Sequence, residues 1–214
     1  MATIWQYPRT WAGGDLASAS TATLGLNRDI RDNMLASQAV IAETIVTSTA
    51  TSIVSNAILT PFSTRYNNFK IVGSAASAGA LSASFFMWLN NDLSTLYQQS
   101  ALAWRPSSSV AGVSTGSVLT GQIRFTFDLV NGQDVPNAMT SFVINIAAAN
   151  STYNKLVTAI HSEIQDTARG NAPVISMTSG IYRSTAAITN IHFAAGTSTG
   201  PFSIGSIFTL IGLP

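Results

Sequence analysis

The C-terminal stretch of this chain, residues 179–213, limits the fold more than any other feature of the sequence. Ile191 and Phe193 fall on one face of an extended chain, because successive side chains of a β-strand point to opposite sides. Residues 196–201 consist of Gly, Thr, Ser and Pro, which favour turns. Residues 204–213 are almost entirely apolar. We therefore expect a β-hairpin whose last strand must be covered on both faces, by its own domain and by something else.

Further strands are expected between clusters of Gly, Pro and Asn. The clearest lies at residues 119–130, where Ile123 and Phe125 alternate with Arg124 and Thr126 as in a half-buried strand. Many short strands separated by turns are typical of a β-sandwich or a jelly roll. The predicted fold is therefore mainly β, an antiparallel β-sandwich or jelly roll. The other predicted strands are residues 69–74, 80–89, 141–147, 156–162 and 174–182.

Charged side chains are scarce in this chain. They make up 9% of the residues, whereas roughly 25% is usual in soluble domains. Hydrophobic residues make up 46%. A surface of Ser and Thr is one explanation, and burial of surface against copies of the chain or a larger assembly is the other. Large apolar patches mark interaction sites, which favours the assembly.

Composition also limits the partners. The net charge is +1 and no basic run is present, so we do not expect the protein to bind nucleic acid. The absence of cysteine excludes disulfides and cysteine-based metal sites. No signal peptide and no apolar run long enough to span a bilayer is visible. We therefore expect synthesis in a cytoplasm and no membrane partner.

Residues 1–25 are expected to form an extended attachment arm. Trp5, Tyr7 and Trp11 are large apolar groups without a helical period, and Pro8 lies among them. Such a segment cannot bury its own aromatic rings, so it must lay them on another surface. A frayed terminus is the alternative, but it would leave three aromatic rings in water. We therefore predict that these three rings attach the protein to a partner.

Residues 26–60 are predicted to form a helix, as far as residue 45, and then a linker to a sandwich at residues 61–214. Apolar residues recur about every 3.6 residues in a narrow stripe, with Ser37 and Gln38 near its middle. A narrow stripe with small residues suits a short parallel bundle better than a broad monomer core. Together with the low charge, the two-faced apolar strands and the family resemblance given below, it leads us to expect the helix on the axis of a homotrimer. The stripe consists of Leu26, Ile30, Met34, Ile41 and Ile45.

Two motifs near the N-terminus resemble the opening of many phage tail and head appendage proteins. Residues 10–16 are T-W-A-G-G-D-L, and residues 26–33 are L-N-R-D-I-R-D-N. That family opens with Thr-Trp-x-x-Gly and an acidic residue, and continues with a Leu-Asn-x-x-(Ile or Leu)-Arg-Asp helix. In the middle of the chain, residues 90–97 resemble the family only loosely, in an Asn-x-Asp loop before a Tyr. None of these motifs is catalytic.

The C-terminal stretch resembles the ends of phage virion proteins of the small fibre and head-decoration kind. Their pattern is a Ser-Gly-aromatic segment, Ala-Ile-Thr-x-Ile, a Gly-bounded loop with Phe, and Gly-Ser-x-x-x-Leu-x-Gly-Leu. The pattern corresponds here to residues 179–182, 187–191, 200–202 and 205–213, with Ile211 where the family usually has Tyr.

The resemblance implies a virion structural protein and not an enzyme. The expected protein is a homotrimeric short fibre or decoration protein, assembled in the bacterial host cytoplasm and anchored to phage capsid or tail proteins by its N-terminal arm. The alternative is a tail-fibre receptor-binding module that grips host surface glycans through loops such as residues 107–116 and 197–201. These loops are mostly Ser, Thr and Gly, which favours the structural protein, while Trp104, Arg105 and Tyr153 keep the alternative open.

No catalytic, cofactor or metal site is expected. His161 and His192 lack the closely spaced partner of a metal site. Asp92, in an Asn-Asn-Asp run, indicates a polar turn more than a calcium site. Gly-x-Ser-x-Gly occurs around Ser114 and Ser198, but a nucleophile elbow requires a strand-to-helix turn in a parallel sheet. Both serines are predicted to lie in loops of a β region, so we interpret both motifs as flexible turns.

Overall fold

The structure is a computed structural model, and it describes residues 39–48, 52–55, 66–78, 83–104, 112–114, 120–129, 138–164, 173–195 and 201–213. These ranges contain β-strands, turns and no helix. The strands form two sheets, and every strand pair is antiparallel. The predicted mainly β architecture with antiparallel sheets is therefore confirmed.

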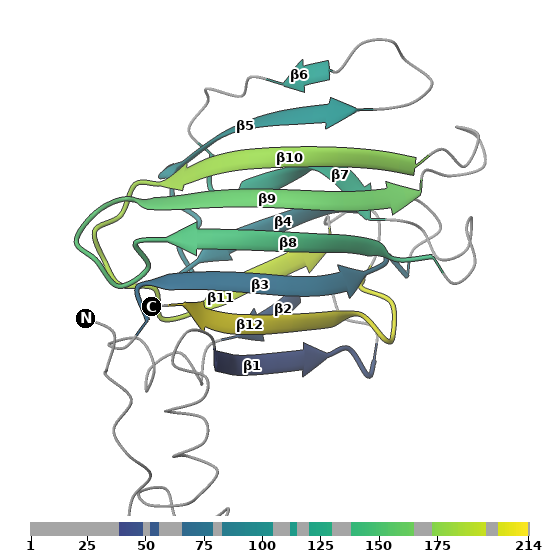
Figure 1. The fold of residues 1–214 in the computed structure, drawn as a ribbon, viewed down its shortest axis with the longest axis horizontal. Coiled ribbons are helices and arrows are strands. Elements are labelled where there is room, and N and C mark those ends of the chain that lie inside the picture. Colours follow the sequence, from purple (N-terminus) through teal and green to yellow (C-terminus); the bar gives the residue numbers. More distant parts are fainter. Residues whose placement is uncertain are drawn as a thin grey trace, which may run out of the picture.

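The larger sheet has eight strands and lies in front in Figure 1. Its order is β1 (Ala39–Ile45), β12 (Ile207–Leu213), β3 (Asn68–Ala75), β8 (Thr140–Ala147), β9 (Lys155–Ile164), β10 (Pro173–Tyr182), β5 (Tyr97–Trp104) and β6 (Gly112–Ser114). The smaller sheet lies behind it, in the order β2 (Ser52–Ser55), β11 (Ile191–Ala195), β4 (Ala83–Leu89) and β7 (Ile123–Leu129).

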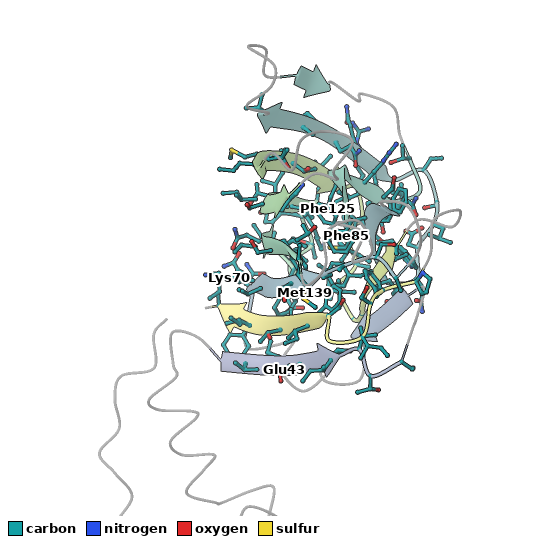
Figure 2. The ribbon with its side chains drawn as sticks, turned by 90° about the vertical axis from the view of Figure 1, so that its right-hand side faces the viewer. Glu43, Lys70, Phe85, Phe125 and Met139 are labelled. Atoms are coloured by element: carbon teal, nitrogen blue, oxygen red, sulfur yellow. The ribbon has the colours of Figure 1, made fainter. Side chains whose placement is uncertain are left out.

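A cluster of phenylalanine rings joins the two sheets. Phe85 of β4 lies 5.2 Å from Phe142 of β8 and 6.4 Å from Phe208 of β12, measured between ring centroids. Phe125 and Phe193 extend the cluster from the smaller sheet. Figure 2 shows Phe85 and Phe125 between the two layers. The sheets therefore pack face to face, and aromatic burial of this kind dominates core energetics.

Side-chain alternation decides which face of each strand enters this core. In β8, Phe142, Ile144 and Ile146 are buried, whereas the residues between them are exposed or half-buried. Gly73 of β3 allows the close packing of Phe142, because a Cβ at this position would overlap the Ile207 carbonyl oxygen and come within 2.6 Å of Cζ of Phe142. The six strands predicted outside the C-terminal stretch all occur as β3, β4, β7, β8, β9 and β10.

The predicted C-terminal hairpin is wrong. Phe193 of β11 lies opposite Ile53 and Met87 in the smaller sheet, whereas Leu210 of β12 lies opposite Ile71 and Ala42 in the larger sheet. Each strand is paired along both of its edges. Pairing along both edges satisfies the backbone N–H and C=O groups on each side of the strand, which a hairpin alone would not do.

The end of the predicted helix is also wrong, because Ala39–Ile45 is strand β1. Val40, Ile41 and Thr44 are β-branched and lose side-chain freedom in a helix. In β1 the chain pairs with β12, with Thr44 opposite Phe208, so its backbone groups are satisfied by the sheet. Residues 26–38 lie outside the described part.

The predicted linker contains a strand of the sandwich as well. Ser52–Ser55 forms β2 and pairs with β11 at the edge of the smaller sheet. Both β1 and β2 therefore belong to the two-layer structure, and its boundary lies no later than residue 39 instead of at residue 61. No helix in the described ranges is long and apolar enough to cross a membrane.

Candidate functional site

The outer face of the larger sheet carries a row of apolar side chains that follows the strand register. Val72 lies opposite Val143, Val143 opposite Ile160, Ile160 opposite Met177, and Met177 opposite Leu102. The row thus crosses β3, β8, β9, β10 and β5. Exposed fractions are 50% for Ile160, 51% for Met177 and 42% for Leu102, and both valines are half-buried. We call these five residues the apolar row.

The side chains around the apolar row are uncharged on β8, β9, β10 and β5, and Lys70 is the charged neighbour of the row on β3. Leu156 and Ile175 are exposed on the same face. The outward side chains described on β8, β9, β10 and β5 are otherwise Ser, Thr, Asn, Gln, Ala and Ile. Lys70 lies on the same face of β3, two residues from Val72, and Figure 2 shows it pointing away from the second sheet. Glu43 lies on the edge strand β1. Exposed apolar rows of this kind are typical of interaction surfaces.

Strand β12 continues this surface with half-exposed Ile207, Ile211 and Leu213, while Phe208 and Leu210 enter the core. The sequence predicted that both faces of the last strand must be covered. Its own domain covers the inner face, and the outer face adjoins the row.

A hydrogen-bonded network lies at one end of the sandwich, in the turn between β4 and β5. Asn90 and Asn91 adopt left-handed backbone conformations, with φ of 57° and 55°. The Asn90 side chain accepts a hydrogen bond from the Thr189 amide at 2.7 Å and donates one to the Ala187 carbonyl at 2.8 Å. The Asn91 amide donates to Oδ1 of Asn190 at 3.0 Å. The network therefore ties this turn to the chain segment before β11.

Asp92 completes the turn as a structural acceptor. Its Oδ1 accepts from the amide and the hydroxyl of Ser94, and its Oδ2 accepts from the Tyr182 hydroxyl at 2.8 Å. The Ser94 hydroxyl is the main cause that lowers the pKa of Asp92. No group of three or more His, Asp or Glu residues in the described ranges could hold a metal ion. The hydrogen bonds of Asp92 therefore agree with the predicted polar turn.

Lys155 lies at the same end and is completely buried. Its Nζ donates to the carbonyl oxygens of Ser151 and Tyr153, each at 2.7 Å, and of Ser184 at 3.1 Å. Burial lowers the pKa of the ammonium group. The lysine connects the loop before β9 to the loop after β10. It holds the backbone of Tyr153 in place, and the Tyr153 side chain is 76% exposed.

His161 of β9 and Ser176 of β10 form a buried pair that sequence analysis missed. The Ser176 Oγ lies 2.6 Å from Nε2 of His161, and the two residues are directly opposite each other in the register. Burial lowers the pKa of His161 to about 4, so its imidazole is neutral at neutral pH. Only the pairing register of β9 and β10 could have revealed this contact. Since both side chains are buried, substrate cannot reach them, and the pair is a packing contact.

A second histidine lies on the outer side of the smaller sheet. The His192 ring stacks on Trp88, with ring centroids 5.0 Å apart and an angle of 19°. Burial lowers the pKa of His192, and its Nε2 has no hydrogen-bond partner among the described residues. The stack is a cross-strand packing contact between β11 and β4.

The predicted site residues divide into two groups. Ile41 and Ile45 belong to strand β1, where Ile41 is buried in the core and Ile45 is exposed, so they do not share the predicted helical stripe. Ser114 lies in β6 and not in a strand-to-helix turn. The others lie outside the described residues: Trp5, Tyr7, Trp11, Leu26, Ile30, Met34, Arg105 and Ser198. For Trp104 the structure describes only the backbone, in β5.

Comparisons with family models, with curated proteins and with solved structures found no match for this chain.

Proposed function

We propose that this protein is a structural component of a bacteriophage particle, a homotrimeric short fibre or decoration protein. The observation that carries the proposal is the exposed apolar row, whose described outward neighbours on β8, β9, β10 and β5 are uncharged. A protein that stayed a monomer would keep this face in water, at a cost of about 25 cal/mol for each Å² of apolar surface. Assembly removes that cost. The N-terminal and C-terminal resemblances to phage appendage proteins indicate that the assembly is a phage particle.

We infer a jelly-roll topology for the two sheets. One sheet contains the neighbouring strands β1, β12, β3 and β8, the other consists of β2, β11, β4 and β7, and the chain crosses between these sets in a regular order. The pairs β9–β10 and β5–β6 then extend one sheet of the roll. Jelly rolls are common in viral capsid proteins, so this topology supports a particle component.

The N-terminal arm, residues 1–25, is proposed as the attachment element, with Trp5, Tyr7 and Trp11 as its anchors. Aromatic side chains in a pocket dominate the energy of many interfaces. The partner is then a capsid or tail protein of the phage, and the protein is assembled in the host cytoplasm and resides in the virion. Because β1 begins at Ala39, only the stripe residues Leu26, Ile30 and Met34 remain candidates for a helix on the trimer axis.

Purified particles test the proposal. We expect the full chain in the particles at a fixed copy number, and a chain without residues 1–23 should fold and associate but no longer join them. Absence of the full chain from purified particles would overturn the virion assignment. Retention of the truncated chain would overturn the role of the arm.

A receptor-binding module for host glycans is the second candidate function. It is favoured by Tyr153, whose ring is 76% exposed on a loop that Lys155 holds in place. Exposed aromatic rings can pack on sugars, and Asn91 and Asn154 offer exposed amides at or near this end. Saturable binding of the protein to host cells, lost in Tyr153→Ala but kept in Ile204→Ala, would favour this function. Unchanged binding by Tyr153→Ala would exclude Tyr153 as the site.

A further inference from the structure

We infer that the outer face of the larger sheet packs against the same face of other copies of this chain, with the apolar row at the centre of the contact. This inference rests on the proposal that the protein is a component of an assembly. It commits to a surface that the sequence did not identify, since the sequence predicted copies of the chain as partners but placed the trimer contacts on a helix.

The size of the face fits a specific interface. The strands β3, β8, β9, β10 and β5 are adjacent and 8 to 10 residues long. With strands about 4.8 Å apart and about 3.4 Å per residue, they present roughly 650–800 Å². A stable complex buries about 800 Å² on each partner. The face of one chain is therefore large enough to hold two copies together.

The chemistry of the face favours a second copy over a different protein. Around a symmetry axis, each side chain near the axis meets its own equivalent, so a charged group there would be repelled by its copy. The described outward side chains of β8, β9, β10 and β5 carry no charge. In the described ranges, charges lie only toward the borders of the five strands: Lys70 is on β3, two residues from Val72, and Arg183 contacts Gln98 near the start of β5. Arg124 contacts Ser84 on the smaller sheet. A different partner would be selected by complementary charge, which the centre of this face does not offer.

The geometry also agrees with three copies. Three faces about 24 Å wide enclose a triangle whose centre lies about 7 Å from each sheet. Two sheets packed face to face are about 10 Å apart, so their midplane lies about 5 Å from each sheet. Side chains as long as Met177 can fill that space. Strand β9 is the middle strand of the five, so Ile160 lies closest to the axis.

The experiment places a charge at this centre in the full chain. Ile160→Lys should weaken self-association by about 100-fold or more, because equivalent lysines would meet at the axis. Ile204→Lys is the matched control, since Ile204 is also exposed (62%) but lies in the turn before β12. Sedimentation velocity should show an oligomer for the wild-type chain and for Ile204→Lys, and a monomer for Ile160→Lys at the same concentration.

Crosslinking keeps the inference testable if the lysine variant fails to fold. The chain has no cysteine, so a single Ile160→Cys provides one unique thiol. A short bismaleimide should link two chains through residue 160 and should not link chains of Ile204→Cys. A monomeric wild-type chain, or an oligomer that neither crosslinks at residue 160 nor responds to Ile160→Lys, would overturn the inference.

These outcomes separate the inference from the proposed function. A chain that is monomeric in solution but present in purified particles removes the self-contact and leaves the particle role in place. A chain that associates through Ile160 but is absent from particles supports the self-contact and removes the particle role.

Discussion

The ring of Tyr97 stacks on the ring of Tyr182, with centroids 4.7 Å apart and an angle of 18° between the ring planes. The two tyrosines lie opposite each other at the start of β5 and the end of β10. Tyr97 Oη accepts a hydrogen bond from the Leu89 amide at 2.8 Å, whereas the Tyr182 hydroxyl donates to Asp92. Through these two hydrogen bonds, the stacked pair anchors the turn between β4 and β5.

The two hydroxyl groups should differ in their contribution to stability. Tyr97→Phe leaves the buried Leu89 N–H without its acceptor, so we expect the free energy of unfolding to fall by about 1–3 kcal/mol. Tyr182→Phe removes a bond to the Asp92 carboxylate, but Asp92 is half-buried and water can replace the hydroxyl. We therefore expect a loss of about 0.5–1.5 kcal/mol, less than the roughly 1.5–3 kcal/mol of a buried bond to a charged group. Urea unfolding of both variants measures the difference. A larger loss for Tyr182→Phe than for Tyr97→Phe would contradict this assignment.

Lys155 should stabilise the loops at the same end. Lys155→Met keeps the length of the side chain but leaves three carbonyl oxygens without their donor, and we expect a loss of about 2 kcal/mol. The loss should be local, so amide hydrogen exchange should increase in residues 148–154 and 183–190 more than in β8. Uniform or unchanged exchange would show that the lysine does not hold these loops. Leu156→Met, on the outer face of the same strand, is the control.

The buried imidazole of His161 makes stability depend on pH. Burial lowers its pKa in the folded state to about 4, whereas histidine in the unfolded chain titrates near 6.5. The unfolded state therefore binds more protons between these two values, so stability is full above about pH 6.5 and falls as the pH is lowered toward 4. The loss attributable to this group is about 3 kcal/mol.

The measurement compares the wild-type chain with His161→Gln at pH 7 and pH 4.5, at one protein concentration because self-association shifts stability. Other groups, such as Asp92, contribute to acid destabilisation in both chains. The informative quantity is therefore the difference between the two pH dependences. We expect a smaller loss in the variant, and equal losses would show that His161 does not titrate as its burial implies.

Local patterns in the sequence identified β3, β4, β7, β8, β9 and β10 as strands, and in the clearest of them also the side chains that enter the core. Alternation identified Ile123 and Phe125 as core residues because adjacent side chains of a strand point to opposite faces. It failed for β5, since buried Tyr97 and Ala101 are separated by polar residues without a clear period. In segments with few apolar residues, the alternation of apolar and polar side chains is too weak to identify a strand.

Only the tertiary structure decided how the strands are paired. The apolar stripe of residues 39–45 is compatible with a helix, whereas the β-branched residues in the same run favour a strand. Pairing with the open edge of β12 made it a strand. The same holds for β11 and β12, which neighbour each other in sequence but lie in different sheets. The His161–Ser176 contact and the apolar row both depend on cross-strand register. Register arises from hydrogen bonds and packing between segments far apart in the chain, and no local pattern contains that information.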